Sequence, residues 1–344
     1  MVTIKNIAHY AGVSIGTVDR VIHNRGNVSK KTESKIRKTI DELNYKPNIF
    51  ARNLKLSKDY TFGVLMPQLT QDSNYWRFPA NGIKKAEEEL KKHRVNVIFF
   101  HYDRYSHLSF SESCLQILNS NLDGLLIAPV LSAVAQEFVE RIPPSLPYVF
   151  FDSFVPNSQC LSNINQNSYL GGRLSAKLMH MIVKEPGVIA AVRVLPEDYH
   201  INERIEGFIS FFSENTGNTV VVYDAVREKN EAVFHKLTER IIAENKNIKG
   251  IFVSNALTYC VAQYVEEVSL NKKIHIIGYD LIDENIVYLK KGIIDFLISQ
   301  QPETQGYKGI YTLYQNVVLN EEVPDKIMMP LDIITNENID YYKR

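Results

Sequence analysis

The sequence predicts an all-α helix-turn-helix headpiece followed by an α/β core of two doubly wound parallel-sheet lobes. Apolar residues recur at helical spacing within residues 4–22. From residue 60 to residue 342, short β-branched and aromatic runs alternate with amphipathic stretches, which is typical of parallel sheets covered by helices. Nine such runs over about 280 residues are more than one compact unit usually holds, so we expect two lobes.

The first two predicted helices are joined by a tight turn. The first helix has one apolar face, made of Ile4, Ile7, Ala8 and Ala11. Gly12 follows where a turn needs a residue that tolerates positive φ, and Ser14 is a suitable N-cap for the second helix. The inner side of that helix carries Val18, Val21 and Ile22. Two short helices joined in this way form a helix-turn-helix, although an ordinary helical hairpin has the same pattern.

A third helix completes the predicted headpiece. Ser29 can cap it, and its apolar stripe consists of Ile36, Ile40 and Leu43. Its outer face is basic and carries Lys30, Lys31, Lys35, Arg37 and Lys38. Pro47 suits the first turn of a fourth helix over residues 48–56, which is too short to be stable alone.

The charge of the chain is divided between its two parts. The formal net charge is zero, yet residues 1–58 hold 12 Lys and Arg against 4 Asp and Glu. The rest of the chain therefore holds 27 basic and 35 acidic residues. A basic head on an acidic body favours phosphate binding through the head alone.

Residues 3–56 resemble the DNA-binding headpiece of the lactose/galactose/purine repressor (LacI) family. The resemblance implies a DNA-binding domain at 1–46, a hinge helix or linker at 47–58 and an effector-binding domain at 59–344. It also implies a set of DNA-binding residues, namely Thr3, Ser14, Ile15, Gly16, Thr17, Arg20, Asn27, Asn48, Arg52, Leu54 and Lys55.

Within that set, Ile15, Gly16 and Arg20 would face base edges, and Leu54 would wedge into the minor groove. Ile15 and Gly16 stand where many family members carry larger polar side chains, and Asp19 stands where serine is usual. We therefore expect fewer direct base contacts than in those members. The partner would be a pseudo-palindromic operator in double-stranded DNA, bound by a homodimer.

Nine runs of the body are predicted strands, at residues 62–66, 95–100, 124–128, 148–151, 188–194, 220–223, 251–253, 274–279 and 296–298. We expect the first lobe to span about 59–160 and 292–325, and the second about 161–291 and 326–341. Residues 152–158 are the best candidate for a crossover between the lobes.

Polar side chains directly follow several of these runs. Since ligands bind beyond the carboxyl ends of parallel strands, Asp152, Asn255, Asp280 and Gln300 are candidate ligand-binding residues. Arg204 adds a forked donor, and Tyr75 and Trp76 add flat apolar faces. Taken singly, each polar residue also fits a helix cap or a turn, and Trp76 also fits the core.

Carboxylates and amides beside aromatic rings favour a sugar or related polyol, with nucleobases left open. The body also resembles the sugar-binding core that this repressor family shares with periplasmic ribose-binding proteins. By that resemblance, Tyr75 and Trp76 stack on the effector, while Asp152, Arg204, Asn255, Asp280 and Gln300 bond its polar groups. Gln166 departs from the family pattern, where many members carry an acidic residue.

Other features bear on compartment and assembly. Cys114, Cys160 and Cys260 are far apart in apolar surroundings, which favours buried thiols in a reducing cytoplasm. We expect no signal peptide, membrane span, metal or cofactor. No leucine heptad follows residue 332, so a coiled-coil tetramer is not expected.

Two other classes of protein compete with a regulator. A solute-binding protein of a sugar transport system would share the body, but it should carry a signal peptide and lack residues 1–58. An enzyme would use Asp152 and Asp280 as a glycosidase-like carboxylate pair. No nucleophile–base motif accompanies that pair, so we expect no enzyme.

Overall fold

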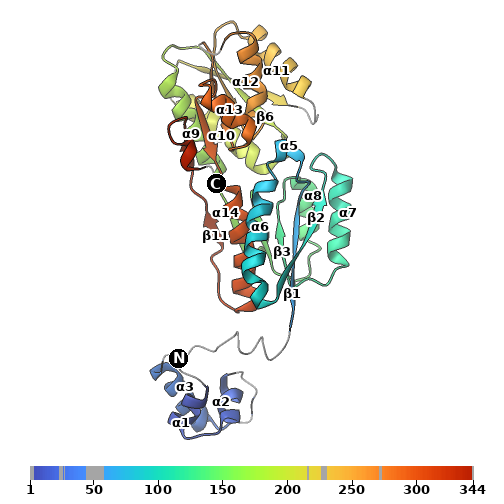
Figure 1. The fold of residues 1–344 in the computed structure, drawn as a ribbon, viewed down its shortest axis with the longest axis vertical. Coiled ribbons are helices and arrows are strands. Elements are labelled where there is room, and N and C mark those ends of the chain that lie inside the picture. Colours follow the sequence, from blue (N-terminus) through green and yellow to red (C-terminus); the bar gives the residue numbers. More distant parts are fainter. Residues whose placement is uncertain are drawn as a thin grey trace. The chain divides into compact units, whose positions relative to one another are not determined.

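The computed structural model describes residues 4–22, 26, 28–43, 58–214, 217–225, 231–270 and 273–342. The chain forms two compact units, Met1–Lys58 and Asp59–Arg344. Figure 1 shows the helical N-terminal unit and the two-lobed body.

The N-terminal unit contains α1 (Ile4–Ala11), α2 (Ile15–Ile22) and α3 (Lys30–Glu42). Their shared core consists of Ile7, Ala8, Ala11, Val18, Val21 and Ile36, as the apolar spacing predicts. Gly12 has a φ of 62°, so the turn between α1 and α2 does use the left-handed region. Ser14 Oγ accepts from Thr17 N at 3.2 Å, and Ser29 Oγ accepts from Thr32 N at 3.3 Å, which confirms both predicted caps.

Six strands form the sheet of the first lobe, in the order β11-β5-β4-β3-β1-β2, and all neighbouring pairs are parallel. Their bounds are β1 Tyr60–Pro67, β2 Val95–Tyr102, β3 Gly124–Ile127, β4 Tyr148–Phe151, β5 Ser162–Asn165 and β11 Lys326–Met328. The first five strands follow the doubly wound order 2-1-3-4-5, which leaves a crevice at their carboxyl ends.

The second lobe repeats this order, β12-β10-β9-β8-β6-β7, with β12 antiparallel to β10. Its strands are β6 Val188–Val194, β7 Thr219–Ala225, β8 Ile248–Val253, β9 His275–Tyr279, β10 Phe296–Ser299 and β12 Asp332–Ile334. The two crevices belong to the same compact unit, so a site between the lobes can draw residues from both sheets.

Helices cover the faces of both sheets (Figure 1). Those of the first lobe are α5 Gln71–Asn74, α6 Arg77–Leu90, η1 Lys91–His93, α7 His107–Leu118, α8 Ser132–Val139, α14 Pro302–Leu313 and π-helical η2 Tyr314–Val318. Those of the second are α9 Ser168–Ile182, α10 Tyr199–Glu214, α11 Glu231–Glu244, α12 Thr258–Glu267, α13 Asp283–Lys290 and η3 Ile339–Tyr341. Helix α6 packs on α14, and α9 packs on α10.

The contact between α9 and α10 depends on a glycine. A Cβ on Gly172 would lie 1.9 Å from the carbonyl oxygen of Arg204, so only glycine lets the two helices approach this closely. This packing holds the backbone of Arg204 against α9 and positions its side chain.

The chain crosses between the lobes three times: after β5, after β10 and between β11 and β12. Gln166 joins all three crossovers, because its Nε2 donates to Ser299 O at 2.6 Å and to Pro330 O at 2.5 Å. The residue that departs from the family pattern therefore lies at the hinge.

The predicted crossover at 152–158 is wrong, because the chain returns to the first sheet as β5 before it crosses. The lobe boundaries shift accordingly. Strands β5 and β11, predicted for the second lobe, belong to the first, and β10, predicted for the first, belongs to the second. The cause is that β5 reads Ser-Asn-Ile-Asn and lacks the apolar run by which a buried strand is recognised.

No disulfide joins the three cysteines; Cys114 and Cys260 are buried, as predicted, whereas Cys160 is only half-buried. Among the described residues, no helix is both long enough and apolar enough to cross a membrane.

Candidate functional site

One cavity lies between the lobes at the carboxyl ends of both sheets, and we call it the interlobe cavity. It is lined by Asp72, Tyr75, Trp76, Arg104, Asp152, His200, Ile201, Arg204, Asn255, Ala256, Asp280 and Gln300. The structure thus brings together all seven residues predicted for the effector. They come from both lobes and are up to 225 positions apart, from Tyr75 to Gln300.

The strand ends turn sharply at this cavity. Asp152 follows β4 with a φ of 67°, and Asp280 follows β9 with a φ of 70°. Aspartate tolerates left-handed backbone better than most residues do, and such positions often mark functional sites. Gln305 supports the turn at Asp152, because its Oε1 accepts from Asp152 N at 2.8 Å. Asn285 supports the other, because its Nδ2 donates to Tyr279 O at 2.9 Å and Asp280 O at 3.0 Å.

Arg204 is the best-held cation of the cavity, with only 1% of its surface exposed. Its Nη1 donates to Ser254 O at 2.8 Å, and its Nη2 donates to Gln300 Oε1. The guanidinium carbon lies 3.9 Å from the ring centroid of Tyr279, within the range of a cation–π contact. These contacts align the guanidinium fork toward the cavity.

The pKa values of two groups in the cavity, Asp280 and Tyr75, are shifted. Burial raises the pKa of Asp280 to about 7, although Arg204 and the hydrogen bond from Gln300 oppose the rise. Gln300 Nε2 lies 2.9 and 3.1 Å from the two carboxylate oxygens of Asp280. On the other side, Tyr75 donates to Asp152 Oδ1 at 2.6 Å. Burial, followed by the negative charge of Asp152, raises the pKa of Tyr75.

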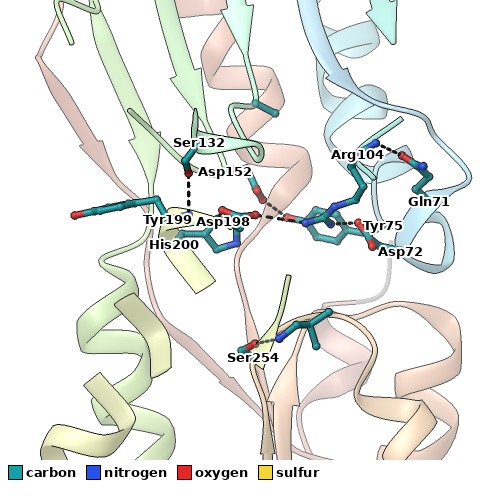
Figure 2. A network of polar contacts seen from close by, with 12 residues as sticks. Gln71, Asp72, Tyr75, Arg104, Ser132, Asp152, Asp198, Tyr199, His200 and Ser254 are labelled. Carbon is teal, nitrogen blue, oxygen red and sulfur yellow. Dashed lines mark hydrogen bonds and ion pairs between the residues drawn. The ribbon is translucent and has the colours of Figure 1, made fainter. Parts of the chain in front are cut away.

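A buried ion-pair network borders the cavity (Figure 2). Arg104 donates through Nη1 to Asp72 and through Nη2 to Asp198 of the other lobe, the latter at 3.4 Å. His200 Nδ1 lies 2.8 Å from Asp198 Oδ1. Trp76 Nε1 donates to Asp72 Oδ2 at 2.8 Å. The network therefore links the two lobes across the mouth of the cavity.

The cavity is nearly filled by its own side chains and contains unsatisfied donors. Its volume is about 20 Å³, which leaves room for about one water molecule. Among the described residues, Arg104 Nε, Arg204 Nε and Asn255 Nδ2 are buried side-chain nitrogens without a hydrogen-bond partner. Leaving such a donor unpaired costs about 1–3 kcal/mol, so these groups indicate a ligand with acceptor oxygens that binds as the lobes open.

Sequence reasoning missed Asp72, Arg104 and His200. Arg104 lies just after the carboxyl end of a strand, as the predicted polar residues do. The predicted run stopped at Phe100, whereas β2 continues through His101 to Tyr102. Extending the strand by two residues would have found Arg104. No sequence signal marks Asp72 or His200.

The aromatic pair does not form an open platform. The rings of Tyr75 and Trp76 meet edge to face, with centroids 5.1 Å apart, and both side chains are at most 5% exposed. The hydroxyl of Tyr75 points to Asp152 (Figure 2). A stacked sugar would therefore require Tyr75 to move away from Asp152.

The start of α2 presents the predicted DNA-reading residues that the structure describes. Ser14, Gly16 and Arg20 are exposed, Thr17 is half-buried and Ile15 is 48% exposed. Val18 and Val21 point into the core, so α2 offers its other side to a groove. The remaining members of the set lie outside the described residues, namely Thr3, Asn27, Asn48, Arg52, Leu54 and Lys55.

A helix-turn-helix unit joined to a two-lobed body with a cavity between its lobes defines a DNA-binding regulator with a ligand-binding domain. Comparison with known proteins identifies the family. Residues 62–321 match the family described as "Periplasmic binding protein domain", and residues 3–48 match "Bacterial regulatory proteins, lacI family". The chain belongs to the periplasmic binding protein domain family and carries a lacI-family DNA-binding domain, as the sequence predicts.

Individual relatives cover nearly the whole chain. It is 27% identical to the ribose operon repressor of Lactococcus lactis, over 98% of each chain. It is 26% identical to the HTH-type transcriptional repressor PurR of Photobacterium profundum, over 94% of this chain and 99% of that one. A solved structure of a protein from Bacteroides fragilis, assigned to the LacI transcriptional regulators, has a TM-score of 0.76 and 26% identity, and covers 83% of this chain and 100% of its own. These matches support a DNA-binding transcriptional repressor over a transport protein.

Proposed function

We propose that this repressor changes its affinity for an operator when a small neutral sugar or polyol binds in the interlobe cavity. The observation that carries the proposal is the pairing of unsatisfied nitrogen donors with the carboxylates of Asp152 and Asp280 in one buried cavity between two lobes. A hydroxyl both donates and accepts, so a polyhydroxylated ligand satisfies both kinds of group.

The charges of the cavity favour a neutral ligand. Two arginines, Arg104 and Arg204, face three lining carboxylates, Asp72, Asp152 and Asp280. Arg104 is already paired with Asp72 and Asp198, so the lining has no net positive charge to balance a phosphate. A nucleobase is the second candidate, because the chain resembles the lactose/galactose/purine repressor family and one relative is named HTH-type transcriptional repressor PurR. A fluorescence titration distinguishes these two classes of ligand.

Trp76 provides the test, because it is the only tryptophan and lines the cavity. We expect one of a panel of pentoses, hexoses and polyols to change its fluorescence with saturable binding. Asp280→Ala should weaken that binding about ten- to hundred-fold, since a hydrogen bond to a charged group contributes about 1.5–3 kcal/mol.

The control for this titration is Asp59→Ala, a substitution at an exposed carboxylate directly before β1, outside the cavity lining. It should leave the affinity unchanged. A response to adenine or guanine alone would replace the sugar with a nucleobase. No response to any sugar, polyol or base would contradict the proposed ligand class.

We further propose that the protein acts as a homodimer on a pseudo-palindromic operator, with Ile15, Gly16 and Arg20 at base edges. The basic residues of the first 58 positions would supply the phosphate contacts. Effector binding would bias an equilibrium between open and closed lobes, and the linker at 47–58 would transmit the change. Coupling of this kind typically amounts to about 1–3 kcal/mol.

We infer no catalytic role for Asp152 and Asp280. Asp152 accepts from Tyr75, and Asp280 accepts from Gln300, so both carboxylates are held as hydrogen-bond acceptors. Within the described part of the chain, no cluster of His, Cys, Asp or Glu is placed to hold a metal ion.

A further inference from the structure

We propose that a second small-molecule site lies at the hinge, separate from the interlobe cavity, and binds a neutral polyhydroxylated molecule no larger than a monosaccharide. This hinge pocket has a volume of about 150 Å³. Its walls include Asn163, Asn165, Gln166, Tyr199, Glu203 and Lys326. None of the residues that line it lines the interlobe cavity.

The floor of the hinge pocket is made of side-chain amides, and one of them has a buried oxygen without a hydrogen-bond partner. Asn163 and Asn165 alternate along β5 and so point to the same side of the sheet. They are 7% and 6% exposed. Gln166 is 4% exposed, and its Oε1 is buried without a partner.

The unpaired oxygen of Gln166 is costly for the protein alone. An unpaired buried amide costs about 1–3 kcal/mol, and strands in this position are usually apolar. The polar sequence of β5 does not predict a buried strand. The strand nevertheless pairs in parallel with both β4 and β11. The amides therefore indicate a bound polar molecule as their partner.

The chemistry of the walls defines the ligand class. Each amide offers two donor hydrogens and an acceptor oxygen, which matches adjacent hydroxyl groups. Phe154 and Tyr199 form an edge-to-face pair with centroids 5.0 Å apart, and this pair gives the pocket an apolar wall. One carboxylate, Glu203, and one ammonium, Lys326, leave no net charge, which disfavours phosphates and polyamines.

The volume limits the size of the ligand. Sites for drug-sized ligands have about 300–1,000 Å³, so a pocket half as large as the smallest of these suits a pentose, a hexose or a short polyol. It is also too large for a single bound water, whose share of liquid volume is about 30 Å³.

The position of the pocket links it to lobe movement. Asn163, Asn165 and Lys326 belong to the first lobe, and Tyr199 and Glu203 belong to the second. Gln166 lies between them and bonds both other crossovers. A ligand that touches both walls binds one lobe angle better than another, and so biases the same equilibrium as the interlobe cavity.

The experiment uses the full chain with Asp280→Ala, which weakens the interlobe cavity. Saturation-transfer NMR with D-ribose, D-glucose and xylitol as probes reports binding. We expect at least one probe to bind, and its signal to fall more than tenfold when Asn165→Leu is added, because leucine removes the amide and fills the floor. Asn96→Leu, the same substitution at an exposed position of β2, should have no effect.

A second variant keeps the test decisive if Asn165→Leu reduces folding. Met328 is 52% exposed at the rim, so Met328→Trp narrows the pocket without disturbing the core. Loss of binding in Met328→Trp supports the hinge pocket. Binding that survives both variants, or no binding of any probe to the Asp280→Ala chain, overturns it.

Discussion

Replacing Arg104 with methionine is expected to lower the free energy of unfolding by about 3–5 kcal/mol, because it leaves buried carboxylates without their counter-ion. Arg104 is 5% exposed, and the side chains of its partners Asp72 and Asp198 are 2% and 0% exposed. Methionine keeps most of the side-chain volume, so the loss would come mainly from charge. Urea unfolding at pH 7, followed by circular dichroism, measures the change.

Arg94→Met is the matched control for this prediction. Arg94 also pairs with a carboxylate, Asp59, but both side chains are largely exposed, at 43% and 61%. Exposed ion pairs contribute little, so this variant should unfold like the wild type. If Arg104→Met were as stable as Arg94→Met, the ion-pair network would not be the buried link that the structure shows.

Replacing Asp280 with asparagine is expected to stabilise the empty protein at pH 8 and to have a much smaller effect at pH 4. The pKa of Asp280 is about 7 in the folded chain, against an ordinary value of 3.8. Between these values the folded chain holds a proton that the unfolded chain has lost, so the free energy of unfolding falls as pH rises from about 4 to about 7.

Asparagine cannot ionise and so avoids this loss. One pKa unit corresponds to about 1.4 kcal/mol, which places the gain at pH 8 on the order of 2–4 kcal/mol. Asp59→Asn provides the opposite case: the hydrogen bond from Arg94 lowers the pKa of Asp59, so this variant should gain nothing at pH 8. Equal stability of Asp280→Asn and the wild type at pH 8 would show that burial does not hold the proton on Asp280.

The raised pKa of Asp280 and its proposed role in sugar binding are connected. A carboxylate that is unfavourable in the empty site is kept when its hydrogen bonds to a ligand matter more than stability. The same substitution should therefore make the protein more stable and weaken its binding of sugar. By contrast, replacing a residue whose only role is packing should lower the stability of the protein.

The rule that ligand-binding residues follow the carboxyl ends of parallel strands explains how much of the site could be predicted. Asp152, Asn255, Asp280 and Gln300 each follow an apolar run, and doubly wound sheets bring such positions together at one edge. Arg104 was missed because the polar residue His101 interrupted the apolar run of β2. The rule succeeds where strands are apolar to their ends and fails where they are not.

The path between the lobes could not be predicted for a related reason. β5 carries amides where apolar residues were sought, so the strand was overlooked and the first crossover was placed too early. The headpiece was predicted more completely, because its three helices have regular apolar spacing and standard capping residues. Local signals therefore sufficed for α1 to α3, whereas the hinge depends on contacts between distant segments such as Gln166 and Pro330.

The most direct test of the account is the affinity of the full-length protein for an operator with and without the sugar identified through Trp76. The operator is first selected from random double-stranded DNA by the purified protein, and the dissociation constant is then measured by fluorescence anisotropy at constant salt. We expect a saturating sugar to change that constant about 5- to 150-fold, and to have little effect in Asp280→Ala. An unchanged constant, at a sugar concentration that saturates the Trp76 signal, would contradict control of DNA binding by the interlobe cavity.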